Sequence, residues 1–224
     1  MVDAPPLVWQ ASLFAADGEP HVDVSFDGLV RHQLDEESWV DHVPGWLTGS
    51  DELFDWLVHN VDWGEHDRLM YGRMVAQPRL TAPHWCPQDD TTPAPLRAIA
   101  AALTERYGRT FDSVGANLYR DGRDSVAWHG DRIARTVERP LVATISLGSR
   151  RRFLMRPKGG GPSVKFEPDK GDLLVMGGMA QRTWQHTVPK VAHAGPRISV
   201  TVRTIEGEEQ YLLGPIRTRA DASR

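Results

Sequence analysis

The stretch that most clearly decides the fold lies near the C-terminal end and reads RISVTVR, residues 197–203. As a β-strand, it would place successive side chains on opposite faces. The apolar face would carry Ile198, Val200 and Val202. The polar face would carry Arg197, Ser199, Thr201 and Arg203. That polar face either meets solvent or lines a lumen in which the two guanidiniums hold a dicarboxylate, because arginine pairs bidentately with carboxylate oxygens.

Short runs of this kind fill the chain from about residue 111 onward, with turn residues between them. The predicted strands are 113–119, 125–128, 141–147, 153–156, 163–166, 172–176 and 197–205. The chain also contains 20 Gly and 16 Pro, which punctuate these runs. Several short strands at this spacing are typical of a sandwich, barrel or jelly roll, so we predict a mainly β (α+β) fold.

The first half of the chain combines helical and hairpin patterns. Apolar residues at helical spacing predict two helices, over 52–61 and 96–108. The dipeptide Asp27-Gly28 predicts a hairpin between strands at 22–26 and 29–33.

The length and the charge limit the classes of protein. The 224 residues show no clear linker, so we predict one domain over 1–224, with an N-terminal extension at about 1–110 and a β-rich core at about 111–206. With 26 Lys plus Arg against 30 Asp plus Glu, the net charge of −4 excludes nucleic-acid binding through bulk positive charge alone.

The cysteine content and the hydropathy indicate the compartment. Cys86 is the single cysteine, which excludes an intrachain disulfide and favours a reducing compartment. No apolar run approaches the ~18 residues of a membrane span. We therefore expect a monomeric, cytoplasmic protein without a membrane partner.

The tetrapeptide WHGD at residues 128–131 is a candidate metal site. In an extended chain, His129 and Asp131 point to the same side and offer two ligand atoms together. The histidines that follow are His186 and His193. Two histidines and one carboxylate leave open positions on a metal, as in the non-haem Fe(II) oxygenases. An H-x-D pair alone occurs by chance, and it is more often a polar strand end than a metal site.

The ordered set of motifs is more specific than any one of them. Asn-x-Tyr-x-x-Gly at 117–122 precedes His-x-Asp at 129–131, and a later histidine precedes Arg-x-x-x-Thr-x-Arg at 197–203. Together these motifs resemble the AlkB family, Fe(II)- and 2-oxoglutarate-dependent dioxygenases that repair alkylated nucleic-acid bases. The resemblance covers about residues 40–205 and includes the segments VPGWL at 43–47 and PRLT at 78–81.

The resemblance implies a double-stranded β-helix (jelly roll) with flanking helices, and a substrate lid in the N-terminal extension. It implies Fe(II) ligands at His129, Asp131 and His186. It implies 2-oxoglutarate contacts at Asn117, Tyr119, Arg197, Ser199, Thr201 and Arg203. The implied reaction consumes O₂ and 2-oxoglutarate, releases succinate and CO₂, and removes an N-methyl group as formaldehyde.

Two positions depart from the family pattern. Ser199 stands where the family has Asn, and its shorter side chain can contact the co-substrate through water. Ile133 stands where relatives commonly carry a carboxylate that meets the exocyclic amine of the damaged base. An apolar side chain cannot make that hydrogen bond, so which methylated base is bound stays open.

Substrate contacts are expected on two segments. Tyr71 and Arg73 lie where relatives form part of the lid, and Tyr71 resembles an aromatic that stacks on a flipped base, although a core position fits it equally well. The basic run Arg150, Arg151 and Arg152 either meets phosphates near the mouth of the site or is solvated surface.

Three functions follow from these motifs. The first is oxidative demethylation of N1-methyladenine or N3-methylcytosine type lesions in DNA or RNA, on a single strand or a flipped base. The second is a 2-oxoglutarate oxygenase that acts on a protein, a lipid or a small molecule. The third is a non-catalytic module that binds a metal or an oxoacid.

Overall fold

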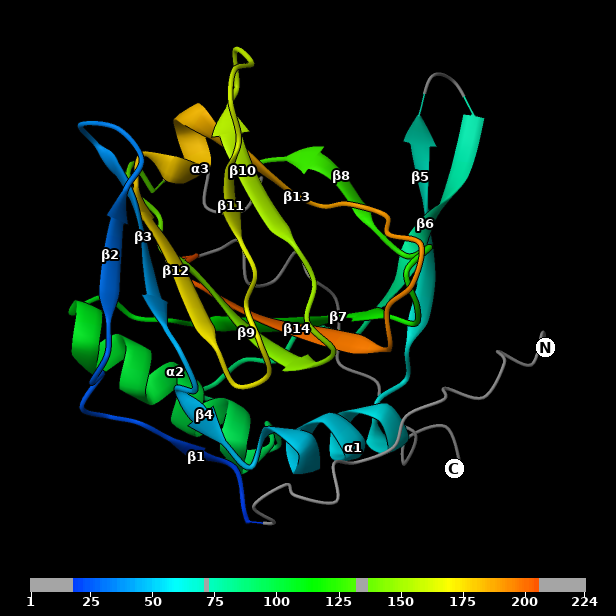
Figure 1. Ribbon diagram of the computed structural model, residues 1–224. Coiled ribbons are helices and arrows are strands. Elements are labelled where there is room, and N and C mark those ends of the chain that lie inside the picture. Colours follow the sequence, from blue (N-terminus) through cyan, green and yellow to red (C-terminus); the bar gives the residue numbers. More distant parts are fainter. Residues whose placement is uncertain (1–17, 71–72, 132–136, 206–224) are drawn as a thin grey trace.

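Two antiparallel sheets face each other in this computed structural model, which describes residues 18–70, 73–131 and 137–205, with the backbone alone for 66–70 and 73–77 (Figure 1). The larger sheet has eight strands in the order β2-β3-β12-β9-β14-β7-β6-β5. The smaller sheet has four strands in the order β11-β10-β13-β8. The strands of the second half of the chain thus build both sheets, as a jelly roll requires.

The bounds of the elements are as follows. The strands of the larger sheet are β2 (Val30–Gln33), β3 (Ser38–Val43), β5 (Gly64–Met70), β6 (Arg73–Thr81), β7 (Ser113–Tyr119), β9 (Val142–Gly148), β12 (Leu173–Gly178) and β14 (Arg197–Arg203). The strands of the smaller sheet are β8 (Val126–His129), β10 (Phe153–Pro157), β11 (Val164–Phe166) and β13 (Trp184–Val188). The remaining elements are the paired strands β1 (His21–Val22) and β4 (Leu47–Thr48), and the helices α1 (Ser50–Asn60), α2 (Ala94–Tyr107) and α3 (Ala180–Thr183).

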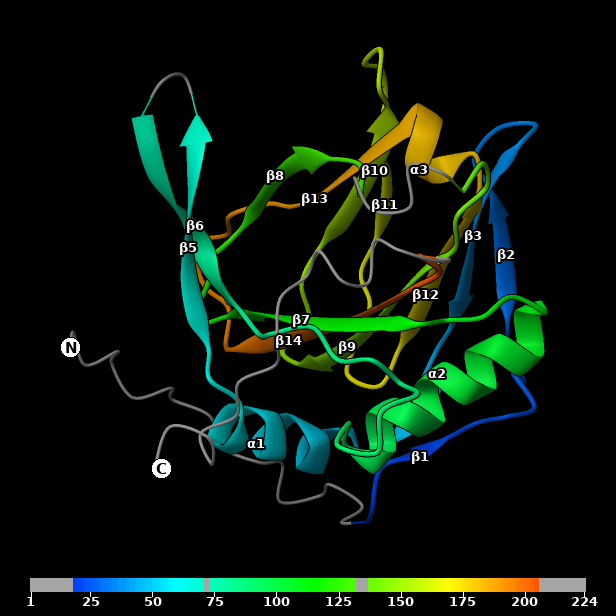
Figure 2. The same ribbon diagram turned by 180° about the vertical axis from the view of Figure 1, so that it is seen from behind.

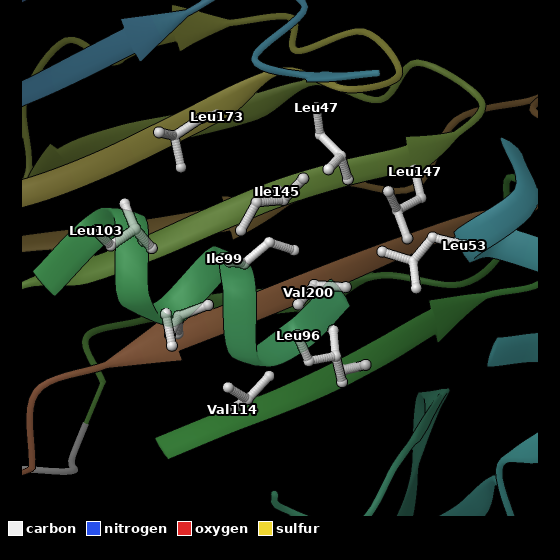
Figure 3. Packing of buried hydrophobic residues seen from close by; sticks show 14 of the residues in the cluster. Leu47, Leu53, Leu96, Ile99, Leu103, Val114, Ile145, Leu147, Leu173 and Val200 are labelled. Carbon is white, nitrogen blue, oxygen red and sulfur yellow. The ribbon is translucent and has the colours of Figure 1, made fainter. Parts of the chain in front are cut away.

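The two predicted helices are confirmed as α1 and α2, and both lie on the side of β7, β9 and β14 away from the smaller sheet (Figure 1, Figure 2). Their apolar stripes supply Leu53, Leu96, Ile99 and Leu103 to a fully buried cluster with the larger sheet (Figure 3). α2 ends at Gly108, which adopts a left-handed conformation (φ 62°) that glycine tolerates best. Among the described helices, none is long and apolar enough to cross a membrane.

Strand β14 has the two faces that its sequence predicts. Ile198, Val200 and Val202 belong to the buried cluster beneath the helices. Ser199 and Thr201 point the other way, into the space between the two sheets. The polar face of β14 therefore lines a lumen rather than meeting solvent.

A second apolar cluster joins the two sheets, and some of its members, such as Phe153 and Met176, line that lumen. It includes Phe153 and Met155 from the smaller sheet, and Leu174 and Met176 from the larger one. The site between the sheets is consequently surrounded by packed side chains.

The strands before residue 111 extend both edges of the larger sheet. β3 pairs with β12 over six residues, and β6 pairs with β7 on the other side. The predicted hairpin at 22–26 and 29–33 is wrong, because β1 pairs with β4 and β2 pairs with β3. The chain turns instead at Phe26 and Gly28, which have φ of 56° and 80°.

Candidate active site

A cavity of about 170 Å³ lies between the two sheets. Its polar lining comes from Arg79, Asn117, Tyr119, His129, Asp131, Thr144, His186, Ser199, Thr201 and Arg203. Its apolar lining comes from Val126, Phe153, Met176 and Val188. All the predicted metal ligands, and all the predicted 2-oxoglutarate residues except Arg197, line this one cavity.

The three predicted metal ligands meet at the smaller sheet. One ligand atom from each of His129, Asp131 and His186 lies within 4.8 Å of the other two. The two histidines face each other across β8 and β13, with ring centroids 4.2 Å apart. The Nδ1 of His129 lies 2.8 Å from the carbonyl oxygen of Ala127. That bond fixes the ring and leaves Nε2 directed at Asp131, as in many metal-binding histidines.

The electrostatics of this cluster suit a metal cation. Burial lowers the pKa of the His186 imidazole to about 3, with a smaller contribution from nearby His129. Burial also lowers the pKa of His129. Burial alone would raise the pKa of Asp131, but the positive charge of Arg203 outweighs it, with help from the two histidines, and the pKa falls to about 2. At neutral pH the site therefore holds two neutral imidazoles and one carboxylate, the protonation states that a divalent metal needs.

Arg203, at the far end of β14, touches the metal-ligand cluster. Its Nε donates a hydrogen bond to Oδ2 of Asp131 at 3.4 Å. The other oxygen of Asp131, Oδ1, lies 4.0 Å from Nε2 of His129. One carboxylate thus faces both an arginine and the histidine pair.

Arg197, at the near end of β14, is 1% exposed and has the chemistry of a carboxylate receptor. Its Nη2 donates to the Ser146 hydroxyl at 2.9 Å, whereas Nε and Nη1 have no partner among the described residues. Burial lowers the pKa of this guanidinium to about 10. A buried cation with two unused donors is costly unless an anion pairs with it, so the site fits the distal carboxylate of 2-oxoglutarate.

The neighbouring strand brings the other predicted co-substrate residues into register. Tyr119 lies opposite Arg197, and Asn117 lies opposite Ser199, across the β7–β14 pair. The guanidinium of Arg197 is 5.5 Å from the centre of the Tyr119 ring. The two motifs, far apart in the chain, therefore form one polar surface because their strands are hydrogen-bonded neighbours.

Sequence reasoning gave no role to Arg79, which lines the cavity. Its Nε donates to Oδ1 of Asn117 at 2.9 Å. Arg79 stands in the PRLT segment, and β6 carries it to the edge of β7. Only the resemblance of the PRLT segment to the family could have indicated a role for Arg79. No local sequence pattern shows that β6 pairs with β7.

The basic run at 150–152 is mostly neutralised. The prediction that Arg151 contacts phosphate is wrong, because its side chain is 3% exposed and donates to the carbonyl oxygens of Asp121, Asp124 and Pro189. Arg150 pairs with Asp169. The Nε of Arg152 lies 3.6 Å from Oε1 of Glu167. The phosphate contact remains a prediction for these two exposed arginines, each of which already has an acidic neighbour.

Three predicted substrate residues are not described. Tyr71 and Ile133 lie outside the described residues, and so does the side chain of Arg73.

Sequence comparison identifies the class of protein. Residues 54–203 match the 2OG-Fe(II) oxygenase superfamily, and the chain belongs to it. This membership confirms Fe(II), 2-oxoglutarate and O₂ as the cofactor and co-substrates.

Individual relatives confirm the resemblance to the AlkB family. The chain is 34% identical over 183 residues to the human alpha-ketoglutarate-dependent dioxygenase alkB homolog 3, a match covering 70% of this chain and 62% of the relative. It is 30% identical to the DNA oxidative demethylase ALKBH2 of Arabidopsis thaliana, over 68% of this chain and 61% of the relative. The chain thus spans less than two thirds of the length of these relatives.

A solved structure confirms the predicted jelly-roll fold. A prolyl hydroxylase from Trichoplax adhaerens, in complex with a hypoxia inducible factor peptide fragment, superposes with a TM-score of 0.55 at 12% identity. The match covers 79% of this chain and 87% of the hydroxylase.

Proposed function

We propose that this protein is an Fe(II)- and 2-oxoglutarate-dependent dioxygenase that demethylates N-alkylated bases in DNA or RNA. The observation that carries the proposal is a cavity between the two sheets that is lined by a His-Asp-His cluster and by Tyr119, which lies opposite Arg197 in the β7–β14 pair. Arg197 is buried, and two of its donor atoms have no partner among the described residues. The cluster would hold Fe(II), and the arginine would hold 2-oxoglutarate. The choice of substrate rests on the similarity to alkB homolog 3 and ALKBH2.

The bound iron, 2-oxoglutarate and O₂ together supply the oxidation of the N-methyl group, which leaves as formaldehyde while 2-oxoglutarate becomes succinate and CO₂. The protein's own contribution is orientation and electrostatics. Arg197 fixes the distal carboxylate, and Asn117 and Tyr119 shape the wall beside it. Arg203 keeps Asp131 ionised. The apolar side chains of Phe153 and Val188 exclude water from the reacting centre.

The position of the cluster in the cavity between the sheets favours a substrate base that has left its stack. A base inside a duplex cannot reach a cavity between two sheets, so a single strand or a flipped nucleotide fits the geometry. We further propose that the protein acts as a monomer in the cytoplasm, the compartment that its single cysteine favours.

One observation favours a second candidate, a 2-oxoglutarate oxygenase with a substrate other than nucleic acid. Arg150 and Arg152 are paired with acidic neighbours, and Arg151 is buried, so the densest basic run offers little free charge to phosphates. The cofactor chemistry would be the same in either case.

The experiment that separates the candidates uses Fe(II)-loaded protein, 2-oxoglutarate and short oligonucleotides that carry N1-methyladenine or N3-methylcytosine. Mass spectrometry follows the loss of the methyl group, and succinate is quantified in the same sample. Asp131→Ala is the control. We expect methyl loss that requires Asp131. Succinate without methyl loss would support the second candidate, and no succinate from iron-loaded protein would contradict both.

A further inference from the structure

Asp131 differs from the other two candidate metal ligands in what holds its backbone in place. His129 and His186 stand on paired strands, β8 and β13, whose hydrogen bonds fix their backbones. Asp131 comes after the end of β8 and is paired with no strand among the described residues. Its carboxylate also has a competing partner, Arg203, at 3.4 Å. Something else must therefore hold the backbone of Asp131 in the orientation that directs the carboxylate at the histidines.

Gln181, on the short helix α3, makes that contact. Its Oε1 accepts a hydrogen bond from the backbone N–H of Asp131 at 3.0 Å. Its Nε2 donates to the sulfur of Met176, 3.3 Å away, and the residue is only 2% exposed. Because only the amide oxygen can accept from an N–H, the side chain has one orientation that satisfies Asp131.

The helix that carries Gln181 is itself firmly placed. A side chain at Gly177 would lie 2.1 Å from the ring of Trp39, and Gly178 has a φ of 63°. The backbone N–H of Met179 then donates to the carbonyl oxygen of Glu37 at 3.0 Å. The turn from β12 into α3 is thus packed directly against β3, where only glycine fits.

The segment that contains Asp131 lies equally close to α3. A side chain at Gly130 would lie 3.0 Å from the backbone oxygen of Gln181. Beyond Asp131, the guanidinium of Arg182 donates to the carbonyl oxygen of Val137 at 2.5 Å. Successive residues of α3 therefore hold the chain at Asp131 and again at Val137.

We propose that Gln181 is a positioning residue of the metal site, which fixes the backbone of Asp131 so that its carboxylate serves the metal rather than turning to Arg203. This inference rests on the proposed function, because it requires Asp131 to be a metal ligand. Residues that orient a metal ligand typically change metal affinity 10–100-fold when they are replaced.

The test is calorimetric titration of the metal-free protein with Mn(II), well below its melting temperature. Gln181→Leu removes the acceptor and should weaken Mn(II) binding by at least about tenfold. Gln181→Glu keeps an acceptor oxygen at the same reach and should bind Mn(II) more tightly than the Leu variant. The matched control is Gln185→Leu, because Gln185 adjoins His186 in the chain but does not line the cavity. The control should stay within about threefold of the unsubstituted protein.

Amide hydrogen exchange of Asp131 is the second measurement, and it needs no metal. The N–H should exchange faster in Gln181→Leu and remain protected in Gln185→Leu. Equal Mn(II) affinity of the Leu variant and the unsubstituted protein would overturn the positioning role and leave the metal site intact. Failure of the unsubstituted protein to bind Mn(II) would overturn the metal site and the positioning role together, even if exchange showed the hydrogen bond to be present.

Discussion

The two faces of the larger sheet carry opposite chemistry on the same strands. One face of β14 carries Ile198, Val200 and Val202, which are fully buried in the cluster that α1 and α2 share with the larger sheet. Figure 3 shows Val200 beside the leucines of that cluster. The other face presents Ser199, Thr201 and Arg203 to the cavity between the sheets, and it also carries the buried Arg197. Buried charges are costly, and the cost is tolerable where a large apolar face stabilises the same strands. The helix-covered face thus contributes most to stability, and the cavity face carries the side chains that would bind ligands.

Two buried arginines, Arg151 and Arg197, differ in how many of their donor atoms are hydrogen-bonded. Arg151 and Arg197 are both almost completely buried. The guanidinium of Arg151 donates to three backbone carbonyl oxygens, and only its Nε lacks a partner among the described residues. The guanidinium of Arg197 donates to one hydroxyl, and both its Nε and its Nη1 lack a partner among the same residues. The difference lies in the terminal nitrogens: both of those in Arg151 are hydrogen-bonded, whereas one of those in Arg197 remains available to a ligand.

The largest effect is expected for Asp131→Ala. Removal of the only carboxylate of the cluster should reduce succinate formation by more than about 100-fold, because loss of a ligand weakens the metal more than loss of a supporting residue does. Glu167→Ala removes an exposed carboxylate outside the cavity and should leave the rate unchanged. Comparable rates in the two variants would contradict the assignment of the metal site.

Arg197→Met should act on the co-substrate rather than on stability. We expect the KM for 2-oxoglutarate to rise roughly 100-fold, because a buried charged contact of this kind is worth about 2–5 kcal/mol. The free energy of unfolding of the ligand-free protein should change little, since the guanidinium leaves few partners behind. Steady-state kinetics and urea denaturation of the same preparation measure both quantities.

Leu103→Ala tests the helix-covered face. Leu103 is fully buried, and truncation of such a side chain costs about 2–5 kcal/mol of unfolding free energy. The folded protein should keep its KM for 2-oxoglutarate, because the substitution lies on the other side of the sheet. A KM that changed together with stability would show that the two faces are not independent.

Arg151→Met should lower the stability of the protein and leave the KM for 2-oxoglutarate unchanged, which is the opposite of what we expect for Arg197→Met. The substitution removes the side-chain donor from three carbonyl oxygens, of which that of Asp121 still accepts from the backbone N–H of Asp124. We therefore expect a loss of about 1–3 kcal/mol in unfolding free energy. The KM for 2-oxoglutarate should remain within about twofold. If Arg151→Met raised the KM and left stability unchanged, the contrast between the two arginines would fail.

The pH dependence of metal binding should be the smallest effect. Two histidines with the ordinary pKa of 6.5 would lose about 100-fold in affinity between pH 7.5 and 5.5, since protons compete for both rings. Here burial lowers the pKa of His186 to about 3 and that of His129 as well, so protonation begins only at lower pH. Mn(II) affinity should therefore fall less than tenfold over this range in calorimetric titrations. A 100-fold fall would mean that the rings are exposed to solvent.

The contrast between the faces also explains how much of the fold the sequence predicts. Strands that bury an apolar face, such as β7 and β9, were predicted to within a residue or two, because alternation or an apolar run is a local signal. β13 reads WQHTV and was missed, because a strand in the wall of a polar cavity lacks that signal. The hairpin at 22–26 failed because Val22 pairs with Leu47, a contact that no local pattern shows.

The residues of the candidate site also fall into those that the sequence indicated and those that only the structure shows. Spacing alone brought His129 and Asp131 together, and the resemblance to the AlkB family added His186 and Arg197. Arg151 was misplaced because a run of three arginines looks solvated, although the middle one points inward beside buried Phe153. The contacts of Arg79 and Gln181 join segments 38 and 50 residues apart, and only the pairing of the elements reveals them.

On its polar face, β14 should bring a metal to its Arg203 end and the distal carboxylate of 2-oxoglutarate to its Arg197 end. A crystal structure with Mn(II) and 2-oxoglutarate tests this arrangement most directly. We predict the metal among His129, Asp131 and His186, and the carboxylate paired with the Nε and Nη1 atoms of Arg197. A metal bound elsewhere, or 2-oxoglutarate bound without Arg197, would contradict the account.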